Sequence, residues 1–128
     1  MQHRKNKFQI GFWNYNHAGE KPAEAYVAEW EELGMNLAMS SVFDPKRSQP
    51  QDLLLELDEA AKRNISVIIY DYRIHWTTLM RSDEETFRKG VLDVKRDFAG
   101  HPAAYGFHIG DEPKKEDNPY VVRAARHY

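Results

Sequence analysis

The chain has 128 residues, of which 41% are hydrophobic and 30% charged, so it can bury the core of one soluble domain. Its net charge of −2 gives no basis for binding nucleic acid or an anionic membrane, and no apolar run is long enough to span a bilayer. The absence of cysteine excludes disulfides and thiolate metal sites.

Strand-like and helix-like segments alternate along the chain. Strands are predicted where β-branched and aromatic residues gather, and helices where apolar residues recur at helical spacing. In chain order we expect a strand at 8–15, a helix at 23–33, a strand at 37–43, a helix at 52–63, a strand at 65–72, a helix at 82–98, a strand at 103–110 and a helix from 118. Ser82 and Glu85 are expected to form a capping box, after a loop at 73–81.

This alternation favours four consecutive βα units with parallel strands, in a single α/β domain that spans residues 1–128. Two architectures fit such units: an open doubly wound sheet and half of a (β/α)8 barrel. The loop after the first strand lacks the glycine-rich fingerprint of a nucleotide-binding sheet. Four units are also close to half of the roughly 250 residues of a full barrel. We therefore predict the N-terminal half of a TIM (β/α)8 barrel, which would need a C-terminal half or self-association to be completed.

The most informative stretch is residues 100–113, Gly-His-Pro-Ala-Ala-Tyr-Gly-Phe-His-Ile-Gly-Asp-Glu-Pro. In a strand, small and polar residues including His108 would share one face, and larger apolar residues the other. Asp111 and Glu112 follow at the carboxyl end of the strand, where parallel α/β folds place their ligands. Two neighbouring carboxylates favour retention of a proton on one of them, as a general acid requires. A simpler interpretation stays open, in which Asp111 caps a turn and Glu112 is solvated.

The same stretch resembles the fourth-strand signature of a large clan of (β/α)8 retaining glycoside hydrolases, in which a His-Pro loop enters a Gly-aromatic strand that ends in Asn-Glu-Pro. Residues 33–36, Leu-Gly-Met-Asn, are similar to that clan's entry into strand two. The resemblance implies hydrolysis of O-glycosidic bonds, with Glu112 as the acid/base. The chain departs from the clan at Asp111, where the clan usually has the Asn that bonds the sugar 2-hydroxyl.

Two alternatives accompany this resemblance. Residues 108–112 are also similar to a run in barrel hexosaminidases that use the 2-acetamido group of the substrate. That similarity implies that Asp111 orients the acetamido nitrogen while Glu112 is the acid/base. The nucleophile of the larger clan lies on a seventh strand that is absent here, so a noncatalytic sugar-binding or half-barrel assembly unit is the other alternative.

The ends of the first and third predicted strands carry further candidates for binding a carbohydrate substrate. Trp13 and Tyr15 would offer aromatic faces for a sugar, with core packing as the alternative for Trp13. Asp71 and Arg73 are two residues apart, so both could face a ligand and bind sugar hydroxyls, or they could form an internal ion pair. The sequence leaves both interpretations open.

Histidines and one more tryptophan complete the candidates. His75 and Trp76 lie on the loop predicted after the third strand, where an aromatic residue suggests binding or a loop folded on itself. His108 could contact substrate, but His108-x-x-Asp111 has no second histidine at ligand spacing. We therefore predict no metal and no cofactor. The first residues lack the apolar core of a signal peptide, which leaves the localisation open between the cytoplasm and secretion after signal removal.

Overall fold

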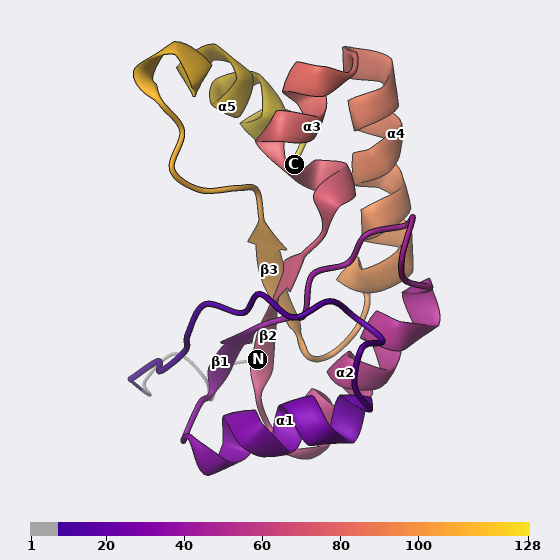
Figure 1. Cartoon of the computed structure of the whole chain (residues 1–128), viewed down its shortest axis with the longest axis vertical. Helices are drawn as coiled ribbons and strands as arrows, with labels where there is room; N and C mark the ends of the chain where they lie inside the picture. The colour runs from indigo at the N-terminus through magenta and orange to yellow at the C-terminus, as the bar shows by residue number, and fades with distance from the viewer. Residues whose placement is uncertain (1–7) are drawn as a thin grey trace.

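A parallel sheet of three strands lies at the centre of the protein (Figure 1). The computed structural model describes residues 8–128. The strands stand in the order β1-β2-β3, with β1 at Leu37–Met39, β2 at Ser66–Tyr70 and β3 at Ala104–His108. Because β2 is paired on both sides and covered by helices, its Val67 and Ile69 side chains are fully buried.

The helices gather in two groups around this sheet. Their bounds are Ala23–Glu32 for α1, Pro50–Lys62 for α2, Trp76–Arg81 for α3, Glu84–Val94 for α4 and Asn118–Ala125 for α5. Shorter turns are η2 at Tyr72–Ile74, the π-helical η3 at Lys95–Ala99 and η4 at Lys115–Asp117. In Figure 1, α1 and α2 lie at one end of the molecule, whereas α3, α4 and α5 lie at the other end, toward which β3 points.

Local side-chain chemistry explains where two of these helices begin. At α2 the backbone N–H of Gln49 donates to Asp52 across 2.8 Å, which together with Pro50 at the first helical position stabilises the start. At α4 the predicted capping box of Ser82 and Glu85 was wrong, because Asp83 is the N-cap. The Asp83 carboxylate accepts from the N–H of Thr86 at 2.8 Å, a bond that Ser82 lies one residue too early to make.

The segment predicted as the first strand is not a strand. Residues 8–15 run beside β1, where the carbonyl of Ile10 accepts hydrogen bonds from the N–H groups of Asn36 and Leu37 at 3.1 and 3.3 Å. A parallel bridge on this side of the sheet comes at His17, which pairs with Val42. Strand-forming residues gain their preference by packing on a half-buried surface, and here that cover is missing. The large side chains of the segment are exposed, namely Phe8, Ile10, Phe12, Trp13 and Tyr15.

The prediction of four βα units forming half of a TIM (β/α)8 barrel was therefore wrong. Within residues 8–128 the sheet has three strands, and this part of the chain is a small α/β domain. The strands that do form are parallel, as strand–helix alternation predicts. The same pattern does not distinguish a paired strand from an extended segment of similar composition, because both have the same residue types. In the described part of the chain, no helix is both long and apolar enough to cross a membrane.

A register shift in β3 changes which of its side chains face the helices. Val67 of β2 pairs with Ala104 and Ile68 with Gly106, so the ladder skips Tyr105. This bulge leaves Tyr105 58% exposed, although alternation placed it on the apolar face. Beyond the bulge, His108 pairs with Tyr70 at the carboxyl ends of the two strands.

Candidate functional site

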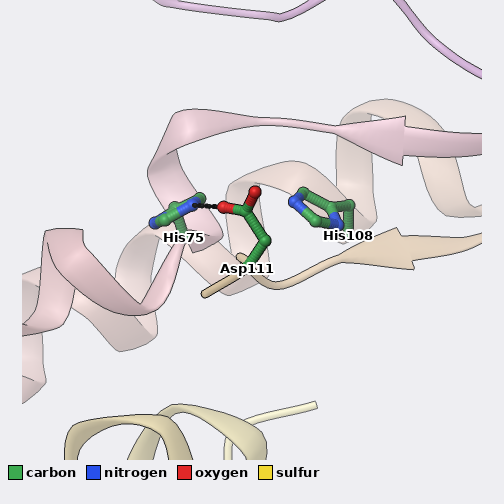
Figure 2. A group of neighbouring side chains, drawn as sticks. All are labelled: His75, His108 and Asp111. Carbon is green, nitrogen blue, oxygen red and sulfur yellow. Dashed lines mark ion pairs between the residues drawn. The ribbon is translucent and has the colours of Figure 1, made fainter. Parts of the chain in front are cut away.

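Three side chains meet where β2 and β3 end (Figure 2). His75 follows the turn η2 after β2, His108 is the last residue of β3, and Asp111 lies just beyond it. Each offers a nitrogen or oxygen atom that can bind a metal ion, and these atoms all lie within 4.8 Å of one another. The distance from Nε2 of His75 to Oδ1 of Asp111 is 4.0 Å.

A glycine turn directs Asp111 toward His75. Gly110 has a φ of +122°, which side chains other than glycine rarely adopt. A Cβ at this position would lie 2.2 Å from Cδ1 of Trp76 and 2.9 Å from Cε1 of His75. The N–H of Trp76 also donates to the carbonyl of Ile109 at 2.9 Å. The buried Trp76 therefore holds the start of α3 directly against the turn that carries Asp111.

The His75 ring is held by the first turn of α3. Its Nδ1 accepts from the N–H of Thr77 at 3.3 Å and lies 2.7 Å from Oγ1 of the same residue. The predicted loop 73–81 is thus largely the turn η2 and the helix α3, with His75 as the N-cap. Because Nδ1 is engaged on this side, Nε2 is the atom left to face Asp111.

Burial controls the protonation of both histidines. Burial lowers the pKa of His75, the neighbouring His108 lowers it further, and the Asp111 carboxylate opposes both effects. Burial likewise lowers the pKa of His108, again against the influence of Asp111. Both rings are therefore neutral at pH 7. Within residues 8–128, Nε2 of His108 is buried and has no hydrogen-bond partner.

Aromatic rings border this cluster. The His108 ring lies edge-on to Tyr70 and to Trp13, with centroids 4.6 and 4.9 Å away. The ring centroids of Trp13 and Tyr15 are 6.4 Å apart. Trp13 is 37% exposed and Tyr15 is 76% exposed. The structure thus brings the aromatic candidates Trp13 and Tyr15 to the same end of the sheet as His108.

A surface pocket of about 590 Å³ adjoins the cluster. Tyr70 and His75 line it, together with residues 44–46 and part of α3. Asp111 and Glu112 do not line this pocket, so the acidic pair and the pocket are neighbouring features connected through His75.

Asp71 and Arg73 form an ion pair at the end of β2. Asp71 is fully buried, and its Oδ2 lies 2.8 Å from Nη2 of Arg73. The other guanidinium nitrogen, Nη1, lies 2.9 Å from Oδ2 of Asp97. Burial raises the pKa of Asp71, and the Arg73 guanidinium opposes that rise. The two candidates therefore connect the end of β2 to the turn η3.

Glu112 differs from Asp71 and Asp111 in having no partner among residues 8–128. The residue is exposed, and among residues 8–128 no group forms a hydrogen bond or ion pair with its side chain. Its φ of 42° lies in the left-handed region, which costs a residue with a side chain about 1 kcal/mol. The turn at 110–112 thus presents a free carboxylate on a constrained backbone.

Sequence reasoning did not bring His75 together with His108 and Asp111. The predicted ligand spacing was that of residues along one strand, whereas His75 follows β2 and the other two residues lie at the end of β3. The sequence did contain a signal for this cluster. The segments with His75 and Asp111 both follow predicted parallel strands, and the carboxyl ends of such strands lie at one edge of a sheet.

Known proteins add nothing to this geometry: no protein-family model matches the chain, and neither the curated proteins nor the solved structures contain a match.

Proposed function

We propose that the carboxyl ends of β2 and β3 bind a carbohydrate and that Glu112 acts as the general acid/base in hydrolysis of an O-glycosidic bond. The observation that carries this proposal is the exposed acidic pair, Asp111 and Glu112, just beyond His108, whose ring packs against the exposed Trp13. Backbone strain at Glu112 adds support, since strained residues concentrate at functional sites.

Binding would use stacking together with hydrogen bonds. The C–H face of a sugar ring packs well on an exposed aromatic face, which Trp13 and Tyr15 provide. The adjoining pocket adds polar groups for sugar hydroxyls, among them Thr77 and Thr78. A ligand that contacts both the aromatic rings and the pocket would pass over His75 and the neighbouring Asp111.

Catalysis would proceed by proton transfer at Glu112. The protonated carboxyl group gives its proton to the glycosidic oxygen as a second carboxylate, supplied from outside this acidic pair, bonds to the anomeric carbon and displaces that oxygen. Water then displaces the second carboxylate from the anomeric carbon, and the Glu112 carboxylate takes the proton of that water. With no partner among residues 8–128, the Glu112 side chain is free to reach a bound sugar.

A second candidate is substrate-assisted hydrolysis of 2-acetamido sugars. Here the acetamido oxygen attacks the anomeric carbon, Asp111 orients the acetamido nitrogen, and Glu112 protonates the leaving oxygen. The observation in its favour is that Asp111 and Glu112 are adjacent on one exposed turn, whereas Asp71 is buried in an ion pair. This candidate needs no further carboxylate.

The test is turnover of a panel of aryl glycosides, with and without a 2-acetamido group, by the folded chain. Glu112→Gln should lower turnover by about 10²–10⁴-fold, the usual contribution of a general acid/base. Glu116→Gln is the matched control, because Glu116 is also exposed and lies four residues further on. Near-normal turnover by Glu112→Gln would remove Glu112 from the mechanism.

The pattern of substrates then separates the candidates. Turnover of acetamido substrates alone would favour the substrate-assisted route. Saturable binding of an oligosaccharide without turnover would leave a noncatalytic binding domain, and Trp13→Ala should weaken such binding by about tenfold. Absence of both binding and turnover would reject the carbohydrate proposal.

A further inference from the structure

We propose that His75, His108 and Asp111 form a binding site for a single divalent transition metal ion, with Zn²⁺ as the best match. The site goes beyond the proposed function and does not depend on it. Two imidazoles and one carboxylate are ligands that Zn²⁺ accepts readily, as in the three-residue sets of catalytic zinc centres.

The distances are close to those of a bound site. Zinc bonds to nitrogen and oxygen are about 2.0–2.2 Å long, so two ligand atoms at the tetrahedral angle on one ion lie about 3.4 Å apart. The 4.0 Å separation of Nε2 of His75 from Oδ1 of Asp111 is slightly longer than this. The whole set lies within 4.8 Å, so side-chain shifts of roughly 1 Å would bring all three atoms to bonding distance.

The ligand atoms are available for coordination. Figure 2 shows a ring nitrogen of His108 facing the Asp111 carboxylate. Nε2 of His108 is a buried polar atom without a partner in the described chain, which is costly unless something binds it. In residues 8–128 the Asp111 carboxylate has no lysine or arginine within ion-pair distance, and its neighbour is the neutral His75 ring, so no side-chain cation competes with a metal ion there.

Thr77 supplies the outer contact that a metal-binding histidine needs. When Nδ1 of His75 carries the proton, it donates to Oγ1 of Thr77 at 2.7 Å and leaves the lone pair of Nε2 free for the ion. The competing tautomer accepts the longer 3.3 Å bond from the Thr77 N–H at Nδ1 and places a proton on Nε2. Metal binding therefore selects the first tautomer, and Thr77 acts as a positioning residue.

The surrounding chain holds the ligands in place while leaving one side open. The bond from the N–H of Trp76 to Ile109 and the tight packing at Gly110 fix the two ligand-bearing loops against each other. The Asp111 side chain is 43% exposed, so a fourth position on the ion would face solvent. Three protein ligands with an open position is the arrangement that binds water or a substrate oxygen.

The test is titration of the chelator-treated chain with Zn²⁺ by calorimetry, and with Co²⁺ by visible absorption. We expect one ion per chain. His108→Ala and Asp111→Asn should each lower affinity by at least about a hundredfold, and Thr77→Val by about 10–100-fold with recovery in Thr77→Ser. His127→Gln is the control, because His127 contacts Glu84 and is not one of the three proposed ligands, so its loss should change affinity less than about twofold.

Circular dichroism of each variant separates loss of ligand from loss of fold. Asp111→Asn is the decisive variant, because it is isosteric and partly exposed. Absence of stoichiometric binding by the folded chain would overturn the proposal. Unchanged binding by Asp111→Asn, or an ion retained by the His108→Ala/Asp111→Asn double variant, would show adventitious binding elsewhere and would overturn it too. No sugar is present, so these outcomes are independent of hydrolysis.

Discussion

The ends of β2 and β3 each carry an aspartate, but the two carboxylates have opposite environments. Asp71 is fully buried and its oxygens accept from Arg73, whereas the Asp111 side chain is 43% exposed and faces a neutral histidine. A buried carboxylate with a bidentate cation is committed to the fold. One that is exposed and lacks a cation remains available to a ligand. Position at a strand end therefore does not by itself make a functional residue.

The largest expected effect tests this difference directly. Asp71→Asn should lower the free energy of unfolding by about 3–5 kcal/mol, because Arg73 would remain half-buried without one of its charge partners. Asp111→Asn should change it by less than about 0.5 kcal/mol. Urea denaturation monitored by circular dichroism measures both. An equal loss of unfolding free energy in the two variants would contradict the distinction between a structural Asp71 and an available Asp111.

A pH titration extends the comparison to Glu56, a buried carboxylate that has no cationic partner in the described residues. Glu56 lies on α2 and accepts the N–H of Ser41 at 2.7 Å, and burial raises its pKa to about 7. The folded state therefore holds this proton more tightly than the unfolded state, where the pKa is near 4.5. Stability from this group is complete below pH 4.5 and is lost as pH rises through 7.

The loss amounts to roughly 3 kcal/mol between these limits. Urea midpoints from pH 4.5 to 8 measure it, and Glu56→Gln should flatten the profile because its amide does not ionise. A wild-type profile with no decline over this range would show that Glu56 keeps its charge when buried.

A smaller effect is expected at the turn that presents Asp111. Gly110→Ala should lower the free energy of unfolding by about 2 kcal/mol, because the added Cβ meets Trp76 and the φ of +122° strains an alanine. Gly100→Ala is the matched control, since a Cβ there meets nothing within 4 Å and φ is ordinary. Thermal denaturation of the two variants compares them. Tolerance of alanine at 110 would mean that the turn does not hold Asp111 rigidly.

Helix predictions came close because they rest on local chemistry. The helix predicted at 52–63 is found at Pro50–Lys62, and that at 23–33 at Ala23–Glu32, followed by Gly34 with a φ of +75°. Spacing of apolar residues and end signals act over a few residues, so a sequence displays them directly. The first strand failed for the opposite reason, since a strand exists only when another segment pairs with it.

The candidate site was predicted in part for similar reasons. Asp111 and Glu112 were singled out because they follow a strand-like run, which is a local pattern that the sequence shows directly. His75 was assigned to a loop, and its meeting with His108 depends on the pairing of β2 with β3 and the packing of Trp76 on Gly110. Neither contact leaves a local pattern.

The sequence by itself determined the helices α1, α2, α4 and α5, the parallel arrangement of the strands that form, and the position of the acidic turn, because propensity and periodicity operate between near neighbours. Tertiary structure decided how many strands pair, which aspartate is neutralised by an arginine, and which histidines meet Asp111. Those outcomes depend on burial and on charges brought together from distant segments, and their energies exist only once the chain has folded.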